Sequence, residues 1–415
     1  MNGYQEAKTR YAAIGVDTEA ALNRLANVSI ALHCWQGDDI VGFENRGGSV
    51  GGGLQVTGDY PGRARTPEEL MADIDKALSL IPGKHRLNLH ACYAIKTAAV
   101  DRDAYTIREF EPWAAFAAER GLAIDFNPTL FGHPMVKNGM TLSHPDEAVR
   151  RFWIDHCKAT RAIAAELGKR QGSPCLHNIW IPDGLKNTPS DRLGPRRRLK
   201  ESLDEIYAVE YDAAYIADSL ECKLFGTGVE SYTTGNSEFY LSYAAKNGKM
   251  ALLDNGHFHP TESVADKLSS LLLFFDKVAL HVTRGVRWDS DHVVLLDDEI
   301  RDIAYELVHC DALDRTFIGL DYFDASVNRI AAWVTGMRSL QKALLAALLM
   351  PHETLRGLQD SFNGTKHMVL LEELKLYPVG AVWDEFCRRA GVPQGANYMD
   401  EVDAYEAAVL SQRSK

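Results

Sequence analysis

The stretch Met250-Ala251-Leu252-Leu253-Asp254-Asn255-Gly256-His257 joins a short apolar run to a carboxylate and an imidazole. The run has the length and composition of a buried β-strand, and Asp254 follows where the strand would end. Three other runs end in the same way: Tyr215–Leu220 before Glu221, Val278–Leu280 before His281, and Thr316–Leu320 before Asp321. Parallel strands that close into a barrel bring such residues to one point. The sequence therefore predicts a convergent site at one end of a barrel.

Strand-like and helical segments alternate through the first 350 residues. Besides the four runs above, we predict strands at Val28–Leu32, Arg86–Leu89, Leu122–Phe126 and Leu176–Ile181. Helical spacing occurs between strands, as at Pro67–Leu80, Tyr105–Arg120, Asp146–Leu167 and Thr261–Leu273. Thr66 and Glu69 predict a capping box at the start of the first of these helices. Eight alternations with right-handed crossovers predict an α/β fold, a (β/α)8 TIM barrel. The alternative, an open doubly wound sheet, usually has a Gly-rich phosphate turn after its first strand, and the sequence has none with the right spacing.

Two regions fall outside this alternation. After the last barrel helix, Ser326–Leu349, helical patterns without strands predict an extra C-terminal α-helical region at Thr354–Leu376, Val382–Ala390 and Met399–Ser411. We expect residues 1–350 to form the barrel with an N-terminal helix and a Gly-rich loop insertion. Residues 351–415 should form an oligomerisation region, because a closed barrel offers a helical tail no internal core to fill. The Gly-rich connection, residues 35–60, is interpreted either as a flap over the barrel mouth or as an ordinary loop.

Composition excludes several classes of protein. The chain has 415 residues, 46% of them hydrophobic and 25% charged, which is typical of a globular protein. A net charge of −12 argues against a nucleic acid or an anionic membrane as partner. The first ten residues lack the apolar core of a secretory signal, and no apolar run approaches the length of a membrane span. Seven scattered cysteines without a C-x-x-C pair suit reduced thiols, so we expect a cytoplasmic protein.

The convergent residues have the chemistry of metal ligands. Clustered carboxylates must be neutralised, and divalent cations do so most simply. Asp254 and His257 could each reach a metal, although a turn aspartate and a core histidine would give the same pattern. Asp289 and Asp291 form a second acidic pair, for which exposed loop acids are the alternative. His281 would be interpreted as a core histidine if it did not stand at a strand end.

Five other side chains near strand ends could act on a substrate. Lys223 could donate to an oxygen that gains charge during the reaction, with a plain salt bridge as the alternative. His90 could move a hydroxyl proton, or it could be a buried structural histidine. Trp35, Phe131 and Trp180 offer apolar faces that stack on a sugar ring, although core packing is the default for each.

These segments together resemble the L-rhamnose isomerase family. The similarity covers nearly the whole chain and rests on five strings: HCWQGDD at 33–39, NIWIPDG at 178–184, GHFHPTE at 256–262, VRWDSDHVVLLDD at 286–298 and GLDYFDAS at 319–326. The order of the ligand motifs is also similar to that of the wider xylose isomerase group. The resemblance implies a homotetramer that interconverts L-rhamnose, a small sugar, with L-rhamnulose by means of two divalent metal ions.

The resemblance also implies a role for each matching position. A structural metal would be held by Glu221, Asp254, His281 and Asp321, and a catalytic metal by His257, Asp289 and Asp291, with Asp254 as a bridge. The oxygen-rich donor set suits Mn²⁺, with Co²⁺ or Zn²⁺ as alternatives. His90 would assist ring opening, and Lys223 would donate to the C1 oxygen. Hydrogen would then pass from C2 to C1 as a hydride, which analogy with the xylose isomerase group favours, or through an enediol.

Two other functions are compatible with the same barrel. A metal-dependent hydrolase or endonuclease also uses clustered His and Asp residues at strand ends. The acidic net charge and Lys223 favour the isomerase, because a nuclease needs a basic groove. The other alternative is a non-catalytic assembly protein with a structural metal, in which replacing Asp289 would leave no activity to lose.

Overall fold

The structure is a computed structural model, and it describes residues 3–44, 56–223, 231–286 and 291–413. Within these residues, eight parallel strands close into a barrel in the order β1-β10-β9-β8-β6-β4-β3-β2. The barrel strands are β1 (Ser29–His33), β2 (Lys84–His90), β3 (Ala123–Asn127), β4 (Cys175–Trp180), β6 (Ile216–Glu221), β8 (Met250–Asp254), β9 (Val278–Val282) and β10 (Thr316–Leu320). The predicted barrel is confirmed, and each predicted strand overlaps one of these eight.

The barrel strands are largely buried on both faces because helices cover the outside while side chains fill the inside. Every residue of β4 is buried, and so is every residue of β9. The barrel closes where β1 pairs with both β2 and β10. All eight strands run in the same direction, so their carboxyl ends open on a single face. Among the predicted site residues, Glu221, Asp254 and His281 lie at or near this face.

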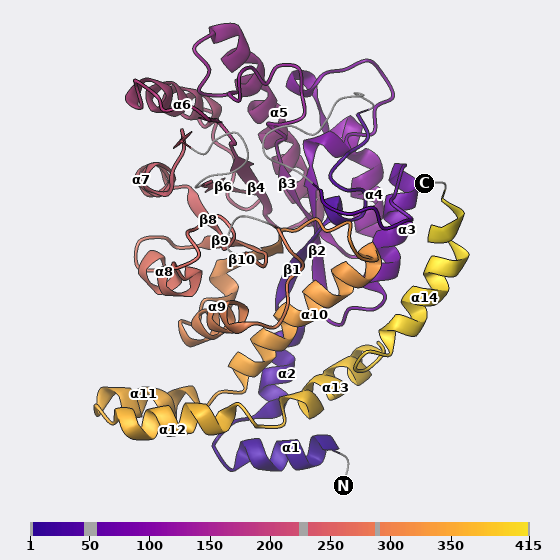
Figure 1. Ribbon diagram of the computed structural model, residues 1–415, viewed down its shortest axis with the longest axis vertical. Helices are drawn as coiled ribbons and strands as arrows, with labels where there is room; N and C mark the ends of the chain where they lie inside the picture. The colour runs from indigo at the N-terminus through magenta and orange to yellow at the C-terminus, as the bar shows by residue number, and fades with distance from the viewer. Residues whose placement is uncertain (1–2, 45–55, 224–230, 287–290, 414–415) are drawn as a thin grey trace.

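Helices surround the barrel in Figure 1. They are α3 (Pro67–Leu78), α4 (Glu111–Glu119), α5 (Glu147–Gln171), α6 (Leu193–Ile206), α7 (Ser237–Asn247), α8 (Val264–Leu271), α9 (Asp298–His309) and α10 (Arg329–Leu348). Two helices, rather than the single one expected, precede the first strand: α1 (Gly3–Ala12) and α2 (Thr18–Asn27). The break lies at Gly15, which has a φ of 80°, and at Asp17, whose side chain caps α2. A short antiparallel pair, β5 (Gly184–Leu185) and β7 (Tyr232–Thr233), lies outside the barrel.

Two local predictions differ from the structure. The helix expected over Tyr105–Arg120 is shorter, because Pro112 lacks an amide hydrogen and stands in the first turn of α4. The capping box at Thr66 is only half formed. Thr66 accepts a hydrogen bond from the amide of Glu69, but the Glu69 carboxylate accepts from the amide of Arg65 instead of that of Thr66.

The C-terminal region is helical, as predicted, and consists of α11 (His352–Asp360), α12 (Gly364–Leu374), α13 (Val379–Ala390) and α14 (Tyr398–Ala408). The helix expected over Thr354–Leu376 is divided into two, because Phe362 adopts a left-handed φ of 55° and Asn363 caps the next helix. The expectation that the tail has no core to fill is wrong for α13. This helix packs on α1, α2 and α10 and buries Trp383 and Phe386 there.

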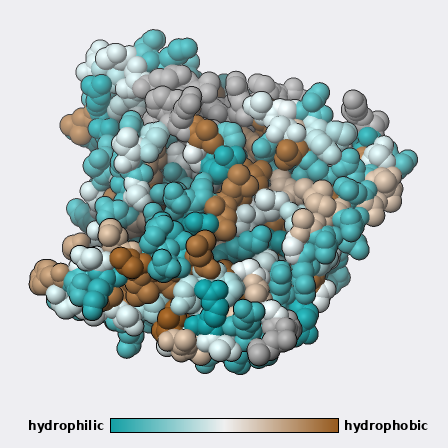
Figure 2. Space-filling view, turned by 60° about the horizontal axis from the view of Figure 1, so that its bottom comes forward, coloured by the Kyte–Doolittle hydropathy of each residue, from teal (hydrophilic) through white to brown (hydrophobic). Residues whose placement is uncertain are grey.

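The α11–α12 hairpin, by contrast, leaves large apolar side chains in solvent. Phe362 is 95% exposed, Leu376 is 82% exposed, and Met368 and Val369 are also exposed. Apolar surface is visible where this hairpin projects at the left of the molecule in Figure 2. Oligomerisation through residues 351–415 therefore remains a prediction that concerns this hairpin more than α13. No helix among the described residues has both the length and the apolar character needed to cross a membrane.

Candidate metal centre

Four adjacent barrel strands, β6, β8, β9 and β10, deliver the central side chains of the site. Glu221 and Asp254 are the last residues of β6 and β8, His281 lies near the end of β9, and Asp321 directly follows β10. One ligand atom from each of these four residues lies within 4.8 Å of all the others. His281 Nδ1 is 3.2 Å from Glu221 Oε2 and 3.2 Å from Asp321 Oδ2. The convergence predicted for these residues is confirmed.

Burial of this much negative charge requires compensation. Burial raises the pKa of Asp254 to about 8, and the charges of Asp321 and Glu221 add to that effect against the opposing charge of His257. Burial alone would lower the pKa of His281, but the neighbouring Glu221 and Asp321 hold it well above its ordinary value. Asp254 Oδ2 is buried and has no hydrogen-bond partner among the described residues. An unsatisfied carboxylate oxygen among converging carboxylates and an imidazole fits a divalent cation.

The predicted second set of ligands is described only in part. His257 is buried beside the four-residue cluster, with Nδ1 3.1 Å from Glu221 Oε1. Asp289 lies outside the described residues. Asp291 adopts a left-handed φ of 42°, and its backbone carbonyl accepts a hydrogen bond from the amide of Phe323. Among the described residues, Asp291 is not a member of the group whose ligand atoms converge.

The predicted substrate-binding side chains lie in contact with one another. The ring centroids are 4.9 Å apart for Trp35 and His90, 5.6 Å for His90 and Phe131, and 5.9 Å for Phe131 and Trp180. The Lys223 ammonium lies 5.2 Å from the centroid of the Trp180 ring. These five side chains form an aromatic wall that carries one cationic group. It adjoins the cluster directly, because Trp35 Nε1 donates a hydrogen bond of 2.9 Å to Asp321 Oδ1.

His90 has a defined hydrogen-bonding state. Its Nδ1 lies 3.2 Å from the carbonyl oxygen of Pro128, which can only accept, so the ring is assigned a proton on Nδ1. Burial lowers the pKa of His90 to about 4, so the imidazole is neutral near pH 7. A neutral ring protonated on Nδ1 keeps a lone pair on Nε2, which can accept a proton.

Sequence reasoning missed the side chains that hold the ligands. Asn178 Nδ2 donates to Glu221 Oε2 at 2.5 Å, and its own oxygen accepts from Ser219 at 2.9 Å. The Asn88 amide lies 3.4 Å from His281 Nε2. Such partners orient metal ligands and tune their basicity. The available signal was an asparagine between two apolar residues in β2, and one next to apolar residues in β4. His259, two residues beyond His257, is exposed and contacts Thr261.

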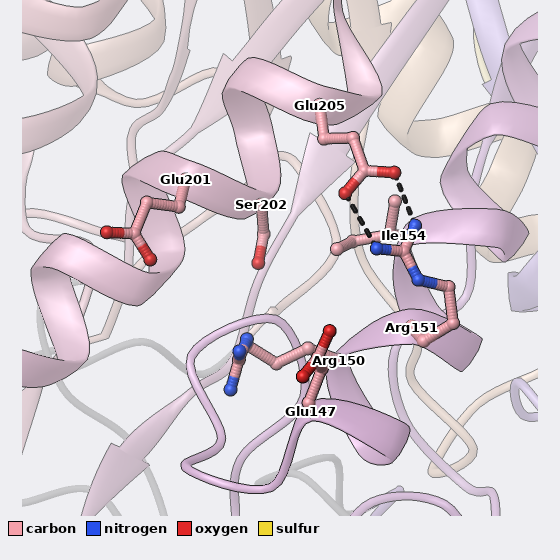
Figure 3. Close-up of a pocket in the computed structure, with 7 residues that line it drawn as sticks. All are labelled: Glu147, Arg150, Arg151, Ile154, Glu201, Ser202 and Glu205. Atoms are coloured by element: carbon pink, nitrogen blue, oxygen red, sulfur yellow. Dashed lines mark hydrogen bonds and ion pairs between the residues drawn. The ribbon is translucent and has the colours of Figure 1, made fainter.

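A separate depression lies on the outside of the barrel between α5 and α6 (Figure 3). Its lining is largely charged, and Arg151 and Glu205 pair with each other across it. It shares no residue with the metal cluster or the aromatic wall. The chemistry predicted from the sequence therefore belongs to the barrel mouth.

Along nearly its whole length, the chain is similar to proteins of one family. A family model described as L-rhamnose isomerase (RhaA) matches residues 1–413. The L-rhamnose isomerase of Pectobacterium atrosepticum is 52% identical over 410 residues, which cover 99% of this chain and 98% of that protein. That of Rhodopirellula baltica is 51% identical over 411 residues, which cover 99% and 96%. A solved structure of L-ribulose 3-epimerase aligns with a TM-score of 0.48 and 14% identity, over 77% of this chain and 95% of that one. The chain belongs to the L-rhamnose isomerase family.

Proposed function

We propose that this protein is an aldose–ketose isomerase that interconverts L-rhamnose and L-rhamnulose with the help of two divalent metal ions. The observation that carries the proposal is the convergence of Glu221, Asp254, His281 and Asp321 at the mouth of the barrel. Family membership over 413 residues selects the isomerase over a hydrolase or an assembly protein with the same kind of cluster. The aromatic wall beside the cluster suits a sugar, whose C–H faces stack on aromatic rings.

Seven residues are proposed as metal ligands. Glu221, Asp254, His281 and Asp321 would hold the structural ion, and His257, Asp289 and Asp291 the catalytic one, with Asp254 bridging the two. The position of His257 beside Glu221 supports a second ion close to the first. The donor set of carboxylates and imidazoles favours Mn²⁺, with Co²⁺ or Zn²⁺ as alternatives. When bound, such an ion supplies Lewis-acid polarisation of the oxygens on C1 and C2.

The side chains of the aromatic wall are proposed to assist ring opening and to bind the sugar. Ring opening removes a proton from the C1 hydroxyl and returns one to the ring oxygen. His90 Nε2 can carry this proton, because the ring is neutral and its Nδ1 is already bound to Pro128. Lys223 would donate a hydrogen bond to the C1 oxygen as charge builds there. Trp35, Phe131 and Trp180 would orient the sugar and exclude water from it.

The hydrogen transfer itself has two possible routes. We favour direct passage of a hydride from C2 to C1, by analogy with the xylose isomerase group. An enediol route would require a base that takes the C2 proton, and this proton would then exchange with solvent. Turnover of L-rhamnose labelled with deuterium at C2 distinguishes the routes. Retention of the label in the ketose supports the hydride route, and its loss to water would overturn it.

The assembly and location of the protein are proposed on separate grounds. The exposed apolar side chains of the α11–α12 hairpin support a homotetramer in which this hairpin is an interface. All seven cysteines are free, and all but Cys310 are buried, which supports a reducing compartment such as the cytoplasm.

The test is a coupled ketose assay on metal-stripped protein, with Mn²⁺ restored and a panel of aldoses supplied. We expect metal-dependent formation of L-rhamnulose from L-rhamnose. Asp289→Asn should abolish turnover without unfolding the protein, whereas Asp403→Asn, an exposed acid on α14, should leave turnover unchanged. Formation of no ketose from any aldose, with Mn²⁺ bound, would refute the proposal.

A further inference from the structure

A buried ion pair lies next to the aromatic wall and contacts the backbone of Phe131. Arg102 is 2% exposed and the Glu44 side chain 5%. The Arg102 guanidinium donates to both carboxylate oxygens of Glu44, with its shortest contact at 2.6 Å. The Tyr105 hydroxyl donates to the same carboxylate. The guanidinium group of a buried arginine is planar and donates several hydrogen bonds at once. It therefore fixes both the distance and the orientation of the groups that accept those bonds.

The same guanidinium also holds the backbone of the loop that follows β3. Arg102 Nη1 donates to the carbonyl oxygens of Thr129 and Phe131, at 2.6 Å each. The amide of Thr129 donates to His156 Nε2, and His156 Nδ1 in turn lies 2.9 Å from the carbonyl oxygen of Arg102. Residues 128–131 are therefore bound on several sides, and Arg102 is the only charged group among these partners.

This loop carries two parts of the proposed site. Phe131 is the central ring of the aromatic wall, between His90 and Trp180. The carbonyl oxygen of Pro128 and the hydroxyl of Thr129 lie 3.2 Å and 3.4 Å from His90 Nδ1. A shift of the loop would thus move an aromatic surface and, at the same time, change the acceptor that fixes the proton on His90.

We propose that Arg102, with Glu44 and Tyr105, is a positioning residue for the isomerase site: through residues 128–131 it sets the placement of Phe131 and the tautomer of His90. The proposal rests on the function proposed above and adds a determinant of sugar selectivity that does not touch the substrate. Arg102→Lys keeps the positive charge but loses the planar guanidinium group. A single ammonium group would then have to replace the hydrogen bonds to one carboxylate and two carbonyl oxygens. The loop then loses its fixed position while the metal ligands keep theirs.

The experiment compares L-rhamnose with L-lyxose, which lacks only the methyl group at C5. For each aldose, kcat and KM are measured with saturating Mn²⁺. Discrimination between a sugar and its analogue without one methyl group depends on close apolar contact and is typically tenfold or more. We expect Arg102→Lys to lower the L-rhamnose preference by about threefold or more, through KM, while Mn²⁺ affinity stays as in the unmodified protein.

The control is Arg86→Lys. Arg86, which is half-buried, also pairs with a buried carboxylate, that of Asp125, and donates to the carbonyl oxygen of Pro174, but it lies toward the opposite end of the barrel from His90. Arg86→Lys should lower thermal stability without changing the preference between the two aldoses. An equal loss of preference in both variants would show that general loosening, and not the position of the loop, is responsible, and it would overturn the proposal.

A second readout does not depend on turnover. The ¹⁵N chemical shifts of the His90 ring, assigned with a His90→Gln variant, report which nitrogen carries the proton. We expect a mixture of tautomers in Arg102→Lys and a single one in the unmodified protein. If the protein isomerises no aldose, the proposed function fails and this spectrum alone decides the positioning role. If Arg102→Lys does not fold, Tyr105→Phe replaces it, with smaller changes in the same direction. Unchanged aldose preference and unchanged His90 shifts in a folded variant would overturn the proposal.

Discussion

Replacement of the Asp254 carboxyl group by an amide should stabilise the metal-free protein and weaken its response to metal. Asp254 Oδ1 accepts a hydrogen bond of 2.7 Å from the amide of Gly256, whereas the buried Oδ2 has no partner within the described part of the chain. In Asp254→Asn, the amide oxygen can keep the bond to Gly256. The new NH2 group would lie close to the carboxylates of Glu221 and Asp321, which in the metal-free state have His281, but no metal ion, as a cationic partner. The substitution thus replaces a poorly solvated acid with a donor.

The magnitude follows from the shifted pKa. Burial raises the pKa of Asp254 from 3.8 to about 8. Between these two values, the folded metal-free protein retains a proton that the unfolded chain releases, so stability falls as the pH rises through this window. At 1.36 kcal/mol per pH unit, the loss at pH 7 is on the order of 4 kcal/mol. For a chain of 415 residues, this corresponds to roughly 4 °C in the thermal midpoint.

The assay is scanning calorimetry in EDTA at pH 5, 6 and 7, with protein concentration and scan rate held constant. We expect the melting temperature of Asp254→Asn to be higher than that of the unmodified protein, and we expect this difference to increase with pH. Saturating Mn²⁺ should reverse the order of the two melting temperatures, because metal binding stabilises the unmodified protein more than the variant. A metal-free Asp254→Asn that is less stable at pH 7, or a margin independent of pH, would refute the reasoning.

Three further predictions concern the surroundings of the ligands and the tail. Trp35→Phe removes the hydrogen bond to Asp321 and should weaken Mn²⁺ binding about tenfold in a chelator competition, with ring packing preserved. Asn178→Ala removes the donor to Glu221 and should weaken binding by a similar factor; affinity equal to that of the unmodified protein would contradict the assigned role. Phe362→Asp places a charge on the exposed turn of the α11–α12 hairpin and should reduce the mass measured by light scattering. An unchanged mass would place the interface elsewhere.

The parts of the fold that could be predicted are those with strong local signals. Four of the barrel strands, β6, β8, β9 and β10, begin as short apolar runs and have a proposed ligand at or near their carboxyl end, so strand and site could be predicted together. Where packing decides, prediction was poorer. The fate of α13 depends on a groove formed by α1, α2 and α10, which no local pattern reveals. The break at Phe362 depends on a left-handed residue that the sequence does not mark with glycine.

The site shows the same limit. Carboxylates and histidines can be proposed as metal ligands from their residue type alone. The roles of Asn88 and Asn178 can be inferred only from the side chains that they contact across the barrel. Arg102 stands in a loop far in sequence from Glu44, and only the folded chain brings them together. Residue type pointed to the proposed ligands, and tertiary contacts show which side chains hold them in place.

The central claim is that Glu221, Asp254, His281 and Asp321 hold a divalent ion at the mouth of the barrel. Anomalous diffraction at the manganese edge, from crystals grown with Mn²⁺, tests it most directly. We predict an anomalous peak enclosed by these four residues, with ligand oxygens and the His281 nitrogen about 2.0–2.3 Å from it. A fully loaded crystal with no peak between them, or with these side chains turned away from the ion, would contradict the account.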